Sequence, residues 1–442
     1  MKRSLTRLDL VVIGVAQIIG AGIFVISGIG VKIAGPGIIL SFLLAGGACT
    51  LAALCYAELA SMMPQAGSAY TYAYGIFGEL AAWIIGWDLI LEYGMGAATV
   101  AAGWSFYLQD LLRAYGLTLP LWASGPPFTT PGRVINLPAA LVVMGFAVLL
   151  IFRTRLNALI ARGLVAVKLG VIAFILALGV FYIRPANWTP FIPFGGGSII
   201  QAASLVFFAY LGFDVVAITA EESRRPEKDV PFGIIGSLAL CSLIYLAVAL
   251  VLVGMVSYTR IDPDAPFSTV FRQVNLPWAA DLVGLGALIG ITSVLYMLLL
   301  AQPRVLFAMA RDGLLPGAVA ALHPRYRTPH RMTLLCGGAV ALVASLTPID
   351  KLAYLCNIGT LFAFFLVCLG VLVLRFTQPA LPRPFRCPGG KLVAATGVLV
   401  CLGLMLSMPE GSWLRLFLWL ALGLVVYFLY AWRSGRLAEN KG

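Results

Sequence analysis

The chain is dominated by apolar runs of about twenty residues, and this feature limits its fold more than any other. A helix of that length crosses the roughly 30 Å hydrocarbon core of a bilayer. Of the 442 residues, 61% are hydrophobic and only 48 are formally charged (30 Lys and Arg, 18 Asp and Glu), so the runs are too many for a single anchor. The sequence therefore predicts an all-α membrane protein that crosses the bilayer repeatedly, and it excludes a water-soluble globule.

Scanning with a window of about nineteen residues predicts twelve transmembrane helices. They cover residues 8–32, 36–62, 80–112, 136–152, 157–183, 197–220, 230–256, 279–310, 332–347, 351–374, 392–408 and 411–432. If the chain starts inside, 21 of the 30 Lys and Arg lie at cytoplasmic ends and 7 at outer ends, which predicts two cytoplasmic termini. The net charge of +12 is then a topology signal, and no nucleic acid partner is expected. We expect the first helix to be retained, because no small-residue cleavage site follows its basic start.

Several function classes are excluded by what the sequence lacks. The connectors are too short for a nucleotide-binding domain and no phosphate-binding loop occurs, which excludes ATP-driven pumping by this chain alone. The eight cysteines form no CxxC pair and lie mostly in apolar runs, and the two histidines share one connector, so no metal or other cofactor is expected. No catalytic grouping indicates an enzyme. A carrier, a channel or a receptor remains.

Two pairs of similar segments indicate an internal repeat. IIGAGIF (18–24) in the first span is echoed by FFAYLGFD (207–214) in the sixth, and PGII (36–39) is echoed by PFGII (231–235), at offsets of 192 and 195 residues. The first and sixth spans run in opposite directions, as in the inverted repeats of many secondary carriers. We expect residues 8–183 and 197–374 to form the two repeats, with two more helices within 392–432.

The glycines of these segments predict two broken helices. Without a Cβ, Gly20, Gly22 and Gly212 allow the backbone to leave helical dihedrals and to approach a ligand closely. A break exposes N–H groups on one half-helix and C=O groups on the other, which hydrocarbon forbids unless a polar cavity receives them. A zwitterion matches both ends, since its carboxylate suits the N–H groups and its ammonium suits the carbonyls. The alternative is that these glycines only permit tight helix packing.

Five ionisable residues are predicted at membrane depth, where an unpaired charge costs several kcal/mol. They are Glu58, Asp88, Glu92, Lys168 and Asp214. Lys168 lies roughly 16 Å into the fifth span, near the midplane. Its buried amine can gain and lose a proton during a transport cycle, or it can neutralise a carboxylate and hold the bundle together. The sequence leaves both roles open.

The remaining polar candidates have weaker signals. Asp88 and Glu92 share one face of the third span, where we expect a structural hydrogen-bond role for Asp88 and a pathway role for Glu92. Asp214 is placed to cap the inner half of the sixth span, and Glu58 lies at the cytoplasmic end of the second, where gating and solvation are both open. The hydroxyls of the 292–293 pair, Thr292 and Ser293, either face a central site or bond to their own backbone.

Taken together, these segments resemble the amino acid–polyamine–organocation permeases, and among them the bacterial members of the cationic amino acid transporter branch. The matching stretches run in order from residue 8 to about 375. They are IIGAGIF (18–24), LCYAELA (54–60), PQAGSAYTY (64–72), GWDLILEY (86–93), FFAYLGFD (207–214), EESRRP (221–226), ARDGLLP (310–316) and NIGTL (357–361). The resemblance implies a leucine-transporter-like five-plus-five inverted repeat with two additional helices, and alternating-access uptake of L-amino acids.

The resemblance also implies a binding site at the two breaks. The substrate carboxylate would meet the N–H groups of Ala21 and Gly22, and its ammonium the carbonyls of Ile18, Phe208 and Leu211. The implied substrate-binding set is Ile18, Ile19, Gly20, Ala21, Gly22, Phe207, Phe208, Ala209, Leu211 and Gly212. Lys168 matches the lysine that replaces an ion in proton-coupled relatives, and Thr292 and Ser293 match the hydroxyl pair beside it.

Two positions depart from the pattern of the family. Relatives often carry Ser or Thr where this chain has Ala21, so a side-chain contact to the carboxylate is lost. Many have Asn before the proline that is Pro226 here, where this chain has Arg225. The first departure affects affinity and the second affects gating.

The leading hypothesis is a proton-coupled L-amino acid carrier in the cell (inner) membrane, with L-amino acid, protons and membrane lipid as partners. An amino acid exchanger without net ion coupling, or a sensor or channel on the same fold, is the alternative, and a small membrane subunit is left open. The bulky apolar residues of the eighth span favour neutral substrates and leave cationic ones open. These residues are Tyr296, Met297, Leu298 and Leu299.

Overall fold

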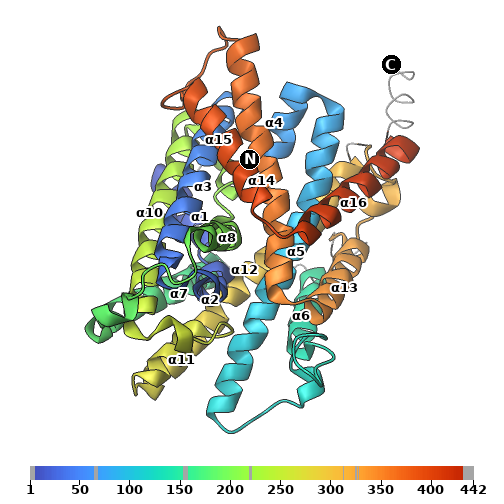
Figure 1. Ribbon diagram of the computed structural model, residues 1–442. Helices are drawn as coiled ribbons and strands as arrows, with labels where there is room; N and C mark the ends of the chain where they lie inside the picture. Colours follow the sequence, from blue (N-terminus) through green and yellow to red (C-terminus); the bar gives the residue numbers. More distant parts are fainter. Residues whose placement is uncertain are drawn as a thin grey trace. The chain divides into compact units, whose positions relative to one another are not determined.

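All regular structure in the described part of the chain is helical (Figure 1). The computed structural model describes residues 5–63, 68–152, 158–218, 222–311, 313–323, 326 and 328–431. Seven helical stretches in these ranges are long and apolar enough to cross a membrane, and three shorter helices are also apolar. The chain is therefore an all-helical, multi-pass membrane protein, as the sequence predicts. Outside the described residues lie the motif positions 64–67, 221 and 312 and the expected cytoplasmic charges Lys2, Arg3, Arg153, Arg155, Arg325, Arg327, Arg433, Arg436 and Lys441.

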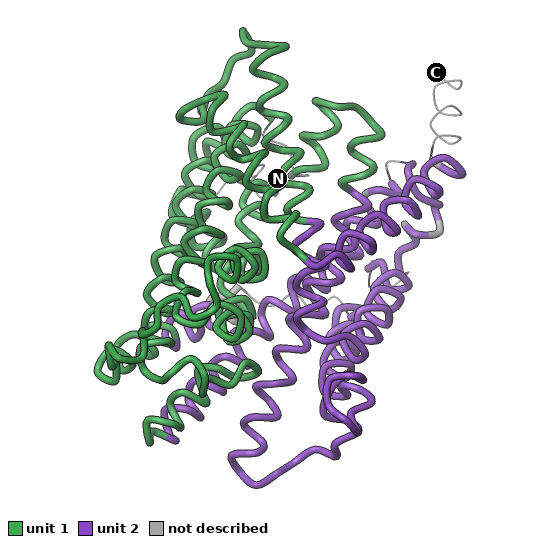
Figure 2. Tube along the Cα trace, in the orientation of Figure 1, with its two compact units in different colours: residues 1–85, 172–276, 360–408 green, residues 86–171, 277–359, 409–442 purple. Residues whose placement is uncertain are grey.

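The chain divides into two compact units, each assembled from three separate segments (Figure 2). Unit 1 contains residues 1–85, 172–276 and 360–408. Its helices are α1 (Arg7–Ile18), α2 (Ser27–Ala34), α3 (Ile38–Met62), α4 (Ser68–Phe77), α8 (Gly196–Val206), α9 (Val215–Ile218), α10 (Pro226–Met255), α11 (Pro266–Gln273) and α15 (Lys391–Leu406). Within unit 1, α10 packs along both α3 and α1, and α8 packs on α3. α3 and α10 are apolar on nearly all sides, which suits helices surrounded by other helices and lipid.

Unit 2 contains residues 86–171, 277–359 and 409–442. Its helices are α6 (Leu137–Ile151), α12 (Pro277–Arg311), α13 (His330–Leu346) and α16 (Glu410–Val426). Three further helices have residues in both units: α5 (Glu79–Ala114), α7 (Ala158–Gly179) and α14 (Ile349–Thr377). Within unit 2, α13 packs on α6, and the indole rings of Trp87 on α5 and Trp419 on α16 stack with their centroids 4.8 Å apart.

Local sequence explains where several of these helices begin. Thr6 caps α1 through a reciprocal pair of bonds with Asp9, and Asn136 accepts a bond from the Ala139 N–H at the start of α6. α10 starts at Pro226, whose missing N–H is no loss in the first turn of a helix. Each cap satisfies a backbone group that the helix itself leaves without a partner.

The helix boundaries differ from the predicted spans in a few places. The second span was predicted from residue 36, but a 3-10 turn at Gly35–Gly37 precedes α3. Two helices were not predicted: α4 has ten residues, and α11 has eight residues with one apolar face. Both are shorter than a bilayer requires, so a search for apolar runs of membrane length does not detect them.

Candidate functional site

The first predicted interruption is present at the end of α1. This helix stops at Ile18, and Ile19 adopts an extended conformation with φ −76° and ψ 108°. Helical structure resumes as a wide π-helical turn, η1 (Gly22–Ile26), which continues directly into α2. The first N–H groups of a new helical segment have no partner within it. The break is short and buried, and residues 18–24 all lie in the interior of the protein.

The second predicted interruption is longer. α8 ends at Val206 and is followed by a 3-10 turn, η6 (Phe207–Tyr210), after which Leu211 is extended with ψ 145°. Gly212 then has φ +111°, a conformation that side chains with a Cβ rarely adopt. Helical geometry returns only in the short α9. A glycine at residue 212 is therefore a requirement of this backbone path.

The two interruptions touch each other within unit 1. A Cβ added to Gly22 would lie 2.3 Å from the Cα of Ala209, and one added to Gly212 would lie 3.1 Å from the backbone carbon of Gln17. The first distance leaves no room for a methyl group, and the second is tight enough that the Gln17 backbone would have to shift slightly. The glycines thus allow the two backbones to approach, which is the packing role that the sequence left open beside the ligand role.

The hydroxyl of Tyr245 bridges the two breaks and was not predicted. This residue is on α10, and its oxygen lies 2.9 Å from the carbonyl oxygens of both Ile18 and Ala209, so its single proton is shared between them. The rings of Phe42 and Tyr210 pack against the Tyr245 ring, and all three side chains are buried. The Ile18 carbonyl, which the resemblance assigns to the substrate ammonium, therefore already has a donor from the protein. A tyrosine inside an apolar run was the available signal in the sequence.

Asp214 lies directly after the second break. Its side chain is buried, and the backbone amides of Gly212 and Val215 lie next to its carboxylate, which suits a cap at the start of α9. The ring of the preceding residue, Phe213, packs on the Tyr56 ring at 5.8 Å and on the Phe364 ring at 5.0 Å. These aromatic contacts hold the end of the interruption against α3 and α14.

Lys168 and the hydroxyl pair lie in unit 2. The Lys168 side chain is 1% exposed on α7. Thr292 donates its proton to the Leu288 carbonyl at 2.7 Å, and Ser293 donates to the Gly290 carbonyl at 2.7 Å, as the backbone-bonding alternative predicted. The indole N–H of Trp104 donates to the Thr292 oxygen at 3.0 Å. Both hydroxyls are thus oriented by the bonds they make to their own helix.

The two predicted carboxylates of α5, Asp88 and Glu92, are buried, as expected for side chains that share a face inside a bundle. Glu92 is 7% exposed, and its backbone carbonyl accepts a bond from the Cys356 thiol. Asp88 is fully buried beside Gly359, where an added Cβ would lie 2.7 Å from the Asp88 Oδ1. The hydrogen-bond role predicted for Asp88 is wrong for the described residues, because neither of its carboxylate oxygens has a partner among them.

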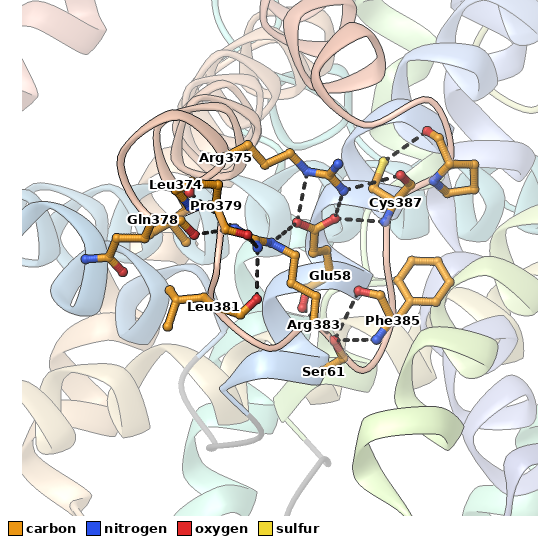
Figure 3. Close-up of polar contacts among 11 residues, drawn as sticks. Glu58, Ser61, Leu374, Arg375, Gln378, Pro379, Leu381, Arg383, Phe385 and Cys387 are labelled. Carbon is orange, nitrogen blue, oxygen red and sulfur yellow. Dashed lines mark hydrogen bonds and ion pairs between the residues drawn. The ribbon is translucent and has the colours of Figure 1, made fainter.

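Glu58 is the centre of a polar cluster that the sequence did not predict (Figure 3). Glu58 is 1% exposed near the end of α3, so the predicted alternative that its carboxylate is solvated by water is wrong. Its Oε1 accepts from the Nε atoms of Arg375 at 3.2 Å and Arg383 at 3.1 Å. Its Oε2 accepts from a second nitrogen of Arg375 and from the Cys387 backbone N–H at 2.8 Å. Four hydrogen bonds therefore converge on one carboxylate.

The same cluster fixes the connection between α14 and α15. Besides Glu58, the Arg383 guanidinium donates to four backbone carbonyls. These are the carbonyls of Leu374, Gln378, Pro379 and Leu381. Ser61, one turn after Glu58, accepts from the Phe385 N–H at 3.1 Å. Contact with the Cys55 thiol and burial raise the pKa of the Cys387 thiol above its ordinary value, so this thiol stays protonated. We call these residues the Glu58 cluster.

A separate ion pair holds the start of the described chain. Arg7 Nε lies 2.7 Å from the Asp229 carboxylate at the beginning of α10, and the Leu5 N–H donates to the Glu222 carbonyl at 3.0 Å. The Arg224 N–H in turn donates to the Leu5 carbonyl. Arg7 is half exposed, so this pair adds less stability than the buried Glu58 cluster.

Helices that cross a membrane and are interrupted partway, with the two interruptions in contact, define a membrane protein of the transporter class. The chain belongs to the amino acid permease family, whose model matches residues 5–427. It is 43% identical over 442 residues to the branched-chain amino acid permease BcaP of Bacillus subtilis, covering 99% of this chain and 95% of the relative.

Other relatives carry different names. The methylthioribose transporter of Bacillus subtilis is 43% identical over 432 residues, with 98% of this chain and 94% of the relative covered. The vacuolar cationic amino acid transporter 4 of Arabidopsis thaliana is 36% identical over 386 residues, which is 86% of this chain and 64% of the relative. Membership makes this chain a transporter of amino acids or related solutes and not an enzyme.

Proposed function

We propose that this protein is a secondary active carrier that couples uptake of neutral L-amino acids to protons. The observation that carries the proposal is the contact between the two interruptions, at Gly22 and Ala209, in a chain of the amino acid permease family. Each of the twelve expected spans overlaps a helix of the structure, which supports the number of spans that a five-plus-five repeat with two additional helices needs.

The proposed substrate site uses the backbone of both breaks. The N–H groups of Ala21 and Gly22 receive the carboxylate, and the carbonyls of Ile18, Phe208 and Leu211 face the ammonium. The segments are buried, so these charge-assisted bonds are not weakened by bulk water. The Ile18 carbonyl oxygen accepts one bond from the Tyr245 hydroxyl, and its second lone pair is available to the substrate ammonium. Alternation between inward and outward openings then moves the substrate across the bilayer.

Lys168 is the proposed proton carrier. Its burial supports this role, because moving a charge in and out of a buried site links protonation to conformation. The hydroxyl groups of Thr292 and Ser293 donate their protons to backbone carbonyls, and the Thr292 oxygen also accepts from the Trp104 indole. They can therefore act as acceptors toward a cationic amine. Glu92 is a candidate for the proton pathway on α5.

The test is transport by purified protein reconstituted into vesicles. An imposed inward proton gradient should drive net accumulation of leucine or alanine, and Lys168→Ala should abolish the gradient dependence. Lys351→Ala, which removes an exposed lysine, is the matched control and should transport like the unmodified protein. Uptake that requires sodium, with Lys168→Ala unaffected, would reject proton coupling. Counterflow without net uptake would indicate an exchanger, and unsaturable flux or binding without flux would indicate a channel or a sensor.

Methylthioribose is the second candidate substrate, because the relative named for it is as similar to this chain as the branched-chain permease. This thiosugar carries neither carboxylate nor ammonium, so it cannot use the charges that the two breaks present. A direct competition experiment separates the candidates. We expect saturable uptake of labelled leucine that excess methylthioribose does not block. Saturable uptake of labelled methylthioribose without uptake of labelled leucine would identify the thiosugar as the substrate.

A further inference from the structure

A pocket of about 220 Å³ lies at the end of α5 in unit 2, where the connection to α6 folds back beside the helix. Two guanidinium groups, those of Arg113 and Arg133, line it together with the hydroxyl groups of Thr118 and Ser124. Leucine side chains, including Leu112, complete the wall. The pocket thus combines the positive charge of two guanidinium groups and the Thr118 hydroxyl with aliphatic surface, whereas the Ser124 hydroxyl donates to the Leu121 carbonyl at 2.9 Å.

The wall that carries Arg133 is held in place by backbone bonds. The N–H groups of Val134 and Ile135 both donate to the Trp122 carbonyl, at 3.1 and 3.0 Å, and Ser124 pairs with Asn136 in an isolated bridge. The Arg133 side chain lies across Gly125, where an added Cβ would be 2.8 Å from the Arg133 Cδ. The guanidinium is therefore positioned by the fold of this connection.

Within the described part of the chain, no acidic side chain pairs with the two arginines of this pocket. Among the described residues, neither Arg113 nor Arg133 forms an ion pair, and the buried Nε of Arg133 has no hydrogen-bond acceptor. A buried N–H without an acceptor is destabilising, and guanidinium groups pair best with carboxylate or phosphate oxygens. No carboxylate is among the described lining residues, so nothing there receives the ammonium of an amino acid. The pocket suits an oxyanion and not the zwitterion proposed as substrate.

The surface around the pocket identifies the source of the oxyanion. Large apolar and aromatic side chains are exposed on the connection that forms it. They are Tyr115, Leu117, Leu121, Trp122, Phe128 and Val134. Exposed Trp and Tyr beside the end of a membrane helix are typical of the interface where lipid headgroups lie. A soluble anion makes no use of such a surface, whereas the glycerol and acyl chains of a lipid do.

We propose that this pocket binds the phosphodiester of an anionic phospholipid. Arg113 and Arg133 donate charge-assisted hydrogen bonds to the two non-bridging oxygens, and the lipid tails follow the exposed apolar surface of the connection. The lining residues of the pocket all belong to unit 2, and none of them is in the proposed substrate-binding set, so the proposal does not depend on the transported solute.

The experiment uses the full-length protein, purified in detergent and stripped of lipid. Thermal unfolding is followed during titration with phosphatidylglycerol, phosphatidylcholine or inorganic phosphate. Each basic side chain near a charged headgroup contributes roughly a fivefold factor in affinity. The double variant Arg113→Gln/Arg133→Gln should therefore bind phosphatidylglycerol about 25-fold more weakly than the unmodified protein. Arg260→Gln removes an exposed arginine of unit 1 and should leave the titration unchanged.

Several outcomes overturn the proposal. Equal responses to phosphatidylglycerol and phosphatidylcholine, or an unchanged titration in the double variant, show that the arginines do not bind a lipid phosphate. An equal response to inorganic phosphate shows a free-anion site. If the double variant fails to fold, Arg133→Lys keeps the charge but loses the planar fork, and it should show a smaller loss. Native mass spectrometry of the unmodified protein is then decisive, with phosphatidylglycerol retained in preference to phosphatidylcholine.

Discussion

The Glu58 cluster provides the sharpest test of the structure, through the substitution Glu58→Gln. The glutamine has nearly the same shape as glutamate, so packing around the end of α3 is preserved. It removes the negative charge between Arg375 and Arg383, and it replaces one of the two acceptor oxygens by an N–H₂ group that cannot accept. At least one of the four hydrogen bonds on this carboxylate must be lost.

The size of the effect follows from burial. Breaking a buried ion pair by removing one partner costs about 3–5 kcal/mol, because the other charge stays buried and unpaired. The Arg375 side chain is 18% exposed and can regain some solvation, whereas the Arg383 side chain is 6% exposed and cannot move away without losing four carbonyl partners. We therefore expect a loss near the lower end of that range, about 3 kcal/mol, in the free energy that holds the 378–390 connection to α3.

Hydrogen exchange of the Cys387 amide measures this free energy directly. In the unmodified protein this N–H donates to Glu58 at 2.8 Å, and it exchanges only when the connection opens. A loss of about 3 kcal/mol corresponds to exchange faster by roughly two powers of ten. The amides of α10 should keep their protection, since they lie outside the Glu58 cluster. Glu410→Gln, at an exposed glutamate, is the matched control and should leave the Cys387 amide unchanged.

The reasoning is refuted if exchange of the Cys387 amide accelerates less than about threefold in Glu58→Gln, since a solvated surface pair is worth only about 0–1 kcal/mol. A variant that loses protection across the whole of unit 1 would also contradict it. In that case the carboxylate would support the entire unit and not the connection between α14 and α15 alone.

Three further predictions concern the two breaks and the Cys387 thiol. Gly212→Ala places a Cβ at φ +111° and should lower the free energy of unfolding by about 1–3 kcal/mol, measured by thermal unfolding. Gly403→Ala is the control, because nothing lies within 4 Å of an added Cβ there. Equal unfolding midpoints for the two variants would contradict the observed backbone path. Tyr245→Phe removes the donor shared by two carbonyls and should lower the unfolding midpoint, with saturating leucine restoring part of the loss, and an unchanged midpoint would argue against the bridge. Because the pKa of the Cys387 thiol is raised, a maleimide should not label it between pH 7 and 8.5 until the protein unfolds, and rapid labelling of the native protein would be the contrary result.

The sequence by itself determined the class of fold and the position of both interruptions. Apolar runs of bilayer length admit little except membrane helices, because lipid requires every backbone group to bond within its own segment. The glycine-containing segments 18–24 and 207–214 predict the two breaks, because a helix inside lipid can be interrupted only where residues tolerate non-helical dihedrals. The five buried ionisable residues were also predicted from depth alone, and the structure buries all of them.

Only the tertiary structure decided which groups those residues meet. Glu58 is separated from Arg375 by 317 residues and from Arg383 by 325, and no periodicity relates positions so far apart. Both arginines belong to the 21 basic residues that the sequence places at cytoplasmic ends, and the structure pairs them with a buried carboxylate. The same holds for Tyr245, whose hydroxyl joins carbonyls on two other helices, and for Asp88, which faces Gly359 without a donor among the described residues. Helix formation depends on neighbours along the chain, whereas the partner of a buried side chain depends on how the helices pack.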